Sequence, residues 1–283
     1  MLKLTFRLGS FENVLNDLGR SADAVMTSPP YNLRGNAKKK TGTRNGNGGY
    51  DSKSLGSIKG YFDNMPEAEY QESQKNAIKW CWNVALKDNG WLLYNHKNRH
   101  RKGKIIPPYR WLIALEEDDI VVGEEFVWDR GSGHNHCKSI ATEITERVYA
   151  LRLDSVPRSK CTFNKDRRGS EMLSDILAIP RGKKFRHVVL GPNGEKVKVE
   201  THDAPFPLEL PRRLLKTFAH PGDLVCDPYC GSGTTGIAAA TLGMNFVGAE
   251  MNPDYYRMAI CRVEEELHVR ARRKNDFAEF KMS

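Results

Sequence analysis

Long apolar runs are missing from this 283-residue sequence, and none approaches the roughly 20 residues that a membrane-spanning helix needs. The first residues contain no apolar stretch followed by small residues, so no secretory leader is predicted. Six cysteines are too few for a disulfide scaffold at this length, which favours reduced thiols and a cytoplasmic location. No internal repeat is found. A hydrophobic content of 39% nevertheless suffices for one large α/β domain or two small ones.

Positive charge is concentrated in three segments. Residues 33–60 hold seven Lys and Arg against one acidic residue, residues 97–104 hold five against none, and residues 152–201 hold twelve against six. Because the net charge is only +9, the rest of the chain is acidic overall. Each segment alone is explained by a solvated loop, but three basic segments on an acidic body favour a track for a nucleic acid.

Strand-like and helix-like segments alternate along the chain. Apolar runs predict strands at 23–27, 91–94, 223–227 and 245–249, and extended segments at 121–122, 126–128 and 147–151. Helical spacing predicts helices at 66–86, 108–115, 211–218 and 234–242, and a last helix from about residue 253 into the charged tail. Turns are predicted at 89–90 and at 191–194, the latter as a hairpin turn before a strand at 196–200. The alternation predicts a mostly parallel sheet covered on both faces.

Residues 223–250 follow the order strand, glycine turn, helix, strand and acid. Gly231 and Gly233 permit positive φ values and close approach of the backbone to a ligand. The free N–H groups that open the next helix favour an anionic group. Glu250 ends the next strand, where an acid can accept hydrogen bonds from both ribose hydroxyls of a nucleoside cofactor. NAD is disfavoured because the third glycine of its fingerprint is absent.

This stretch resembles the DNA amino-methyltransferases. The segment 227–235, Asp-Pro-x-x-Gly-Ser-Gly-Thr-Thr, is similar to their S-adenosylmethionine motif, while 204–211 and 248–255 resemble the segments that contact the methionine and ribose ends. The resemblance implies S-adenosylmethionine as cofactor, S-adenosylhomocysteine as product, and a class I, Rossmann-like methyltransferase fold. The cofactor-binding residues that it implies are Thr27, Ala204, Pro205, Phe206, Asp227, Tyr229, Gly231, Ser232, Gly233, Thr234, Thr235, Glu250, Met251 and Asn252.

A second motif, Ser28-Pro29-Pro30-Tyr31, matches the family's catalytic motif, whose first residue is Asp, Asn or Ser. The amino nitrogen of a base is a poor nucleophile, because its lone pair is delocalised into the ring. The Ser28 hydroxyl and the Pro29 carbonyl are two acceptors for its N–H groups, and Pro30 stiffens the turn. Tyr31 is expected to stack on a base taken out of the duplex. Rate then comes mainly from positioning and desolvation, without a covalent enzyme intermediate.

The catalytic motif precedes the cofactor motif, which is the permuted order of the β group of these enzymes. Protein glutamine methyltransferases and most ribosomal RNA amino-methyltransferases carry the motif after the cofactor turn. We therefore expect a circularly permuted domain with a small target-recognition insert. Its parts are a catalytic half at 1–151 that includes a mobile loop at 33–60, a target-recognition segment at 152–200, and a cofactor-binding half at 201–283.

Double-stranded DNA is the substrate that the resemblance implies. The basic side chains expected to contact it are Arg34, Lys38, Lys39, Arg44, Arg99, Arg101, Arg158, Lys160, Arg167, Arg168, Arg181 and Lys183. A serine at the head of the motif is typical of cytosine-N4 enzymes, whereas Asp is typical of adenine-N6 enzymes. A hydroxyl accepts a hydrogen bond from either amino group, so adenine N6 stays open as the alternative.

Other interpretations also stay open. They are a methyltransferase fold that only binds DNA, and a single-stranded or RNA substrate. A cognate restriction endonuclease and a homodimer are plausible from the resemblance. The segment 134–137, His-Asn-His-Cys, holds three possible metal ligands, but zinc sites usually combine two separated pairs and no second pair is evident. No metal is therefore expected.

Overall fold

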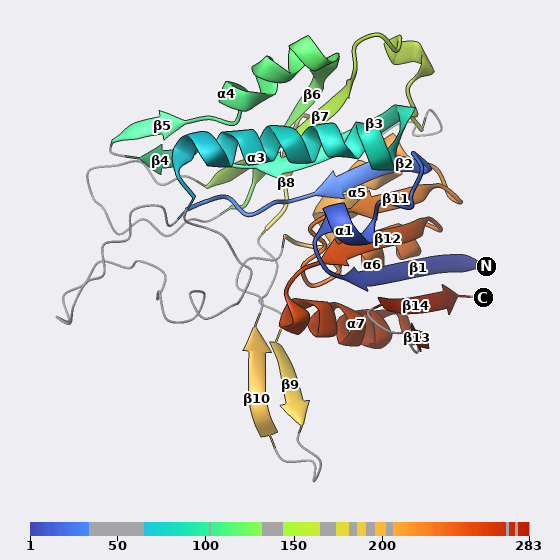
Figure 1. Cartoon of the computed structure of the whole chain (residues 1–283). Coiled ribbons are helices and arrows are strands. Elements are labelled where there is room, and N and C mark those ends of the chain that lie inside the picture. The colour runs from blue at the N-terminus through green and yellow to red at the C-terminus, as the bar shows by residue number, and fades with distance from the viewer. Residues whose placement is uncertain are drawn as a thin grey trace, which may run out of the picture.

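The computed structural model describes residues 1–33, 65–101, 103–131, 144–164, 174–180, 186–190, 196–201, 206–269, 272–274 and 277–282. Within these residues one large sheet forms the centre of the molecule (Figure 1). Its strands are β1 (Leu2–Leu8), β2 (Ala22–Thr27), β3 (Leu86–His96), β6 (Ile120–Asp129), β7 (Thr145–Leu153), β8 (Ile176–Ala178), β11 (Leu224–Asp227), β12 (Asn245–Glu250), β13 (Arg272–Lys274) and β14 (Phe277–Met282).

The strand order in this sheet is β13-β14-β1-β12-β11-β2-β3-β7-β6-β8. The neighbours from β1 through β12, β11 and β2 to β3 are all parallel. β7 is antiparallel to β3 and β6, and β14 is antiparallel to β1. The late strands β11 and β12 thus lie between the early strands β1 and β2, so the sheet brings the two ends of the chain together (Figure 1).

Helices cover both faces of the sheet. One face carries α1 (Phe11–Val14), α3 (Glu67–Trp80) with a π-helical turn at Cys81–Ala85, and α4 (Tyr109–Leu112) with a 3₁₀ turn at Ile113–Asp118. The other face carries α5 (Glu209–Phe218), α6 (Thr234–Thr241) and α7 (Pro253–Leu267). Side chains alternate along the strands: Val225 packs toward the second group of helices and Cys226 toward the first.

The alanine-rich helix α6 lies close against the sheet because its side chains are small. At Gly236, an added Cβ would come within 2.8 Å of Phe6 and 2.9 Å of Phe246. This close packing fixes the distance between the first turn of α6 and the end of β11. The predicted cofactor turn connects the two.

The predicted strand at 23–27 and the predicted helix at 234–242 are confirmed as β2 and α6. The predicted extended segments around 121–128 form the single strand β6, and the predicted helix at 66–86 ends as a π-helical turn. The predicted mostly parallel sheet is likewise confirmed.

The predicted turn at Asn89-Gly90 is an irregularity within β3 rather than a separate turn before the strand. β3 is assigned from Leu86, but its pairing with β2 shifts register between Leu86 and Trp91, and a Cβ on Gly90 would lie 2.8 Å from the carbonyl oxygen of Asp23. Glycine serves here for close packing of two backbones rather than for chain reversal. The predicted helical and charged tail is wrong beyond Leu267, because β14 pairs with β1 and lies between β1 and β13 in the sheet.

The segment 152–200 contributes to two places. β8 pairs in parallel with β6 and buries Leu177 in the core, so it belongs to the main sheet. β9 (Arg186–Leu190) and β10 (Lys196–Thr201) pair as an antiparallel hairpin, which confirms the strand predicted at 196–200 (Figure 1). A short pair, β4 (Arg99–Arg101) and β5 (Lys104–Ile106), and a 3₁₀ turn at Arg158–Lys160 complete the described elements. None of the described helices is long and apolar enough to cross a membrane.

Candidate active site

The two sequence motifs meet at the carboxyl edge of the sheet. β2 and β11 pair as parallel neighbours with Val25 opposite Cys226, so both strands end at the same edge. The Thr27 hydroxyl donates to Asp227 Oδ1 at 2.8 Å and joins the two strand ends directly. Ligands of open α/β sheets bind outside the carboxyl ends of such neighbouring strands.

Asp227 is the centre of this junction. It is 1% exposed and also accepts hydrogen bonds from the Thr235 hydroxyl at 2.6 Å and the Tyr229 N–H at 3.1 Å. Burial raises the pKa of Asp227 to about 6, and the three donors oppose that rise. Thr27 and Thr235, which are predicted to bind a cofactor, donate hydrogen bonds from their hydroxyl groups to Asp227.

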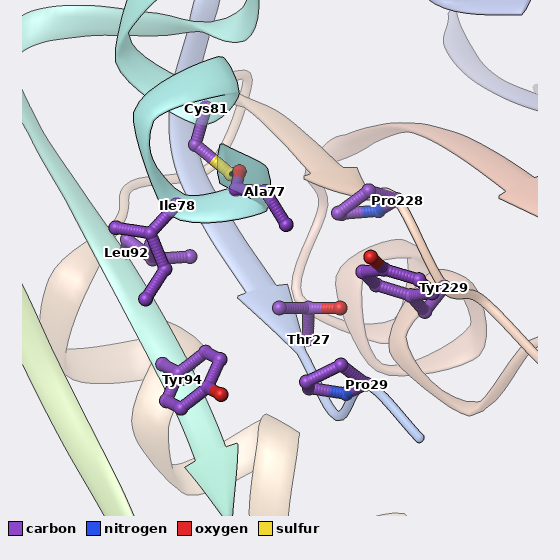
Figure 2. A pocket seen from close by; sticks show the side chains of 9 residues that line it. All are labelled: Thr27, Pro29, Ala77, Ile78, Cys81, Leu92, Tyr94, Pro228 and Tyr229. Carbon is purple, nitrogen blue, oxygen red and sulfur yellow. Dashed lines mark hydrogen bonds between the residues drawn. The ribbon is translucent and has the colours of Figure 1, made fainter. Parts of the chain in front are cut away.

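A small apolar pocket lies between the two motifs (Figure 2). Thr27 and Pro29 from the tip of β2 line it together with Pro228 and Tyr229 that follow β11. Its other wall comes from α3, the π-helical turn and β3, through Ala77, Ile78, Cys81, Leu92 and Tyr94. These surroundings contain few polar groups, which is consistent with the desolvation that raises the pKa of the neighbouring Asp227.

The glycine turn after β11 has the predicted backbone. Gly231 and Gly233 have φ values of +52° and +79°, and Gly233 is the N-cap residue of α6. Arg262 of α7 donates to the Thr234 hydroxyl at 2.6 Å and lies 3.3 Å from the Ser232 hydroxyl. Arg262 therefore braces the turn from behind. Ser232 and Thr234 are distant from Arg262 in sequence. The only local signal for an ordered Arg262 side chain is the i, i+4 spacing to Glu266.

Glu250 faces this turn from the end of β12. Its carboxylate accepts from the Gly231 N–H at 3.0 Å and the Asn252 N–H at 2.8 Å. Burial raises the pKa of Glu250 to about 7, against the lowering effect of these N–H groups. The carboxylate retains lone pairs for two further donors, as a ribose diol requires.

The residues after Glu250 complete the same corner. Asn252 caps α7 by accepting from the Asp254 N–H at 2.8 Å, while its Nδ2 is buried without a hydrogen-bond partner among the described residues. Met251 is exposed beside it, and Phe206 packs partly buried against the core. A turn with positive φ, an acid with open lone pairs and an orphaned amide suit a nucleoside cofactor. Ala204 and Pro205 lie outside the described residues.

Aromatic side chains of α3 and β3 support the catalytic motif. The Tyr70 hydroxyl donates to the Pro30 carbonyl oxygen at 2.8 Å and lies 2.7 Å from His96 Nε2. Because Tyr70 has one hydroxyl hydrogen, His96 Nε2 donates to Tyr70. Burial lowers the pKa of His96 to about 3, so the ring is neutral. The Tyr31 ring lies 4.6 Å from the His96 ring, which fixes its orientation.

A buried polar network connects the motif to β3 and β7. The Tyr31 hydroxyl lies 2.9 Å from Ser28 Oγ and donates to Glu146 Oε2 at 2.9 Å. Asn95 Nδ2 donates to the Tyr31 hydroxyl at 2.8 Å, and Arg130 pairs with Glu146 Oε1 at 3.0 Å. Burial, reinforced by Glu146, holds the pKa of Tyr31 well above its usual value. Sequence reasoning missed Asn95, Arg130 and Glu146, because no local motif marks them.

Arg99 corrects the predicted DNA contacts. Its side chain is 1% exposed and makes two hydrogen bonds with the Glu67 carboxylate at 2.6 and 2.7 Å. Its guanidinium also lies over the Tyr70 ring at 4.4 Å and near Trp111 at 5.5 Å. Because the side chain is buried and both terminal nitrogens bind Glu67, Arg99 supports the aromatic cluster and is unavailable to a phosphate.

The remaining predicted contacts are only partly described. Arg158 is an exposed ion-pair partner of Glu124, and Lys160 is exposed two residues on. Arg101 lies in β4, and nothing is described of its side chain. The others lie outside the described residues: Arg34, Lys38, Lys39, Arg44, Arg167, Arg168, Arg181 and Lys183.

No group of three metal-ligating side chains occurs in the described parts of the chain, and the segment 134–137 lies outside them. Cys226 and Cys230 are buried, and burial raises the pKa of both thiols. Both cysteines are therefore packing residues.

The fold and the site together define an α/β protein of the kind that binds a nucleoside cofactor at the ends of parallel strands. A family model for DNA methylases, N6_N4_Mtase, matches residues 22–260. The chain belongs to this family of N4/N6 DNA methyltransferases.

Relatives agree with this assignment. The chain is 25% identical over 267 residues to the type II methyltransferase M.ScaI of Streptomyces caespitosus, covering 86% of this chain and 75% of that protein. It is 27% identical over 268 residues to M.BglII of Bacillus subtilis, covering 89% and 66%.

Solved structures share the fold. PvuII DNA methyltransferase, described as cytosine-N4-specific, aligns with a TM-score of 0.65 and 21% identity over 91% of this chain and 85% of that one. A DNA modification methylase of Thermus thermophilus, complexed with S-adenosyl-L-methionine and described as putative, aligns with a TM-score of 0.59 and 21% identity, covering 92% and 93%.

Proposed function

We propose that this protein transfers a methyl group from S-adenosylmethionine to the N4 amino group of a cytosine in double-stranded DNA. The observation that carries the proposal is the position of Ser28. Its hydroxyl lies at the tip of β2, one residue from the Thr27–Asp227 link to the glycine turn. A base held at Ser28 and a cofactor held at the turn would therefore be neighbours.

The residues present fit the cofactor. Glu250 would hold the ribose hydroxyls, the turn at 231–233 would pass close to the cofactor, and Asn252 Nδ2 would gain the acceptor that it lacks within the described residues. When bound, S-adenosylmethionine supplies an electrophilic methyl group. The Thr27–Asp227–Thr235 hydrogen bonds keep this side of the site fixed.

The residues of the chain position the amino group. Ser28 Oγ and the Pro29 carbonyl would accept its two N–H groups and direct the nitrogen lone pair toward the methyl group. Tyr31 holds its ring against His96 and would stack on the flipped base through the other face. Such alignment of reacting groups is the main source of rate in a direct transfer.

Cytosine N4 is favoured by the serine at the head of the motif and by the fold shared with a methyltransferase described as cytosine-N4-specific. Adenine N6 is the second candidate. Its support is a match of 38% identity over 72 residues to the DNA adenine methyltransferase YhdJ of Escherichia coli (strain K12), which covers 25% of this chain.

The proposal extends to target recognition, domain order and protein partners. We infer that the segment 152–200 reads the target sequence, since it includes the hairpin β9–β10 and the exposed Arg158 and Lys160. The order of the two motifs supports a circularly permuted domain. The type II relatives support a cognate restriction endonuclease as partner. A homodimer stays a prediction from the family resemblance.

Mass spectrometry of nucleosides tests the proposal. Unmethylated DNA is incubated with the purified protein and S-adenosylmethionine, with a Ser28→Ala variant as control. N4-methylcytosine formed by the unmodified protein alone supports the proposal. N6-methyladenine moves the assignment to adenine, and the absence of both products on varied DNA indicates a DNA-binding protein without activity or a different nucleic acid substrate.

A further inference from the structure

The motif alone does not determine whether the Ser28 hydroxyl donates or accepts a hydrogen bond. A hydroxyl group is both donor and acceptor, whereas an amino group that must keep its lone pair free requires an acceptor. Asp or Asn at the head of the motif offers an oxygen that only accepts. A serine does the same only if its hydrogen is directed elsewhere.

The network behind Ser28 determines where that hydrogen goes. Glu146 is 8% exposed, is paired with Arg130 at 3.0 Å, and as a carboxylate it only accepts hydrogen bonds. Tyr31 therefore donates its single hydroxyl hydrogen to Glu146 Oε2 at 2.9 Å. Asn95 Nδ2 only donates, so Tyr31 accepts from it at 2.8 Å.

The contact between Tyr31 and Ser28 then has one possible direction. The two oxygens lie 2.9 Å apart, and the hydrogen of Tyr31 is already used. Ser28 must donate to Tyr31. Asn95 Nδ2 lies 3.3 Å from Ser28 Oγ, so at least one of the two lone pairs of Ser28 stays open toward the site.

We propose that Glu146, held by Arg130, is a positioning residue that sets the hydrogen-bond direction through Tyr31, so that Ser28 presents an acceptor to the amino group of the target base. The inference rests on the proposed function and adds a reason why serine serves at this position. It holds for cytosine N4 and adenine N6 alike, since both groups present N–H donors.

Glu146→Gln tests the direction of the chain. Arg130 only donates, so it selects the oxygen of the introduced amide and leaves the amide N–H groups facing Tyr31. Tyr31 then donates to Ser28, and the Ser28 hydrogen meets the N–H of the base. We expect kcat to fall about 10- to 100-fold, as for a buried donor left without an acceptor. Affinity for S-adenosylhomocysteine, measured by calorimetry, is expected to stay unchanged.

Two further variants distinguish an effect of Glu146 on hydrogen-bond direction from a purely structural role of Glu146. Glu146→Asp keeps a carboxylate, which only accepts, and is expected to restore most of the kcat lost in Glu146→Gln. Tyr31→Phe keeps the ion pair between Glu146 and Arg130 but removes the hydroxyl that connects Glu146 to Ser28. In this variant, the additional Glu146→Gln substitution is therefore expected to change kcat by less than about twofold. A structural role for Glu146 would instead give additive losses and lower thermal stability in both backgrounds.

The outcomes distinguish this inference from the proposed function. An active unmodified enzyme together with full kcat in Glu146→Gln overturns the inference and leaves the function standing. Additive losses in the double variant also overturn it. An unmodified protein that methylates no amino group in DNA overturns the proposed function and this inference together.

Discussion

Glu250 gives a quantitative prediction for cofactor binding. Burial raises the pKa of its carboxyl from an ordinary 4.5 to about 7. At roughly 1.4 kcal/mol per pKa unit, ionising Glu250 in the free protein costs about 3 kcal/mol more than in water. Ribose hydroxyl groups bind the ionised form as donors, so cofactor binding should lower this pKa and release a proton.

The sign and size of the pH effect follow. Below pH 7 the free protein holds Glu250 mostly protonated, and binding must first remove that proton. The dissociation constant for S-adenosylhomocysteine is expected to rise about tenfold from pH 8 to pH 6, because only about a tenth of a group with a pKa near 7 is ionised at pH 6. Isothermal titration calorimetry in buffers of different ionisation enthalpy measures both the affinity and the released proton.

Glu250→Gln removes the titrating group and weakens the hydrogen bonds to the ribose. We expect about 10- to 100-fold weaker binding at pH 8, as for a lost hydrogen bond to a charged group, and a flatter dependence on pH. Glu265→Gln, the same exchange at an exposed position of α7, is the matched control and should bind as the unmodified protein does. Equal affinity in Glu250→Gln, or an unchanged pH profile, would refute the reasoning.

Three other predictions concern stability. Glu67→Gln leaves the buried Arg99 without its charged partner and should lower the free energy of unfolding by about 3 kcal/mol in urea titrations, whereas a loss below about 0.5 kcal/mol would contradict the buried ion pair. Gly236→Ala forces a Cβ to within 2.9 Å of Phe246 and should cost about 1–3 kcal/mol, seen as a lower Tm; an unchanged Tm would show that the helix shifts without cost. The pKa of Asp227 is raised to about 6, so the stability that its protonated form contributes is present below pH 4 and lost as the pH rises through 6. Relative to Asp227→Asn, the free energy of unfolding of the unmodified protein should fall by about 3 kcal/mol over that interval. Curves of unfolding free energy against pH that run parallel for the two proteins would disprove this assignment.

An exposed ion pair supplies the control for the Glu67 experiment. Arg158 pairs with Glu124 at the surface with 63% of its side chain exposed, so Arg158→Met should change stability by less than about 1 kcal/mol. DNA affinity separates the two arginines further. Arg158→Met should weaken DNA binding, while Glu67→Gln should leave it unchanged in the folded protein.

The sequence predicted those parts of the site that local patterns mark. An apolar run that ends in Ser28, and another that ends in Asp227, place both motifs at strand ends, because a buried strand needs little more than a short hydrophobic run. Parallel pairing of the two strands then brings the motifs together. Glu250 was placed for the same reason.

The remaining features depend on partners that are distant in sequence. Glu146 gains its role from Tyr31, which lies 115 residues away, and no local pattern encodes that contact. Arg99 was assigned to DNA because it lies in a basic segment, but its partner Glu67 lies 32 residues earlier on another element. β14 was missed because its alternation of buried Ala278 and Phe280 with charged residues is short, and the strand is stabilised by pairing with β1 and β13.

The hydrogen bond between Thr27 and Asp227 links the two halves of the site directly. It joins the strand that ends in the base-binding motif to the strand that ends in the cofactor turn, across 200 residues of sequence. A ligand that tightens one strand end thereby tightens the other, and such coupling is reciprocal. Cofactor and target base would accordingly bind cooperatively, each with a higher affinity once the other is bound.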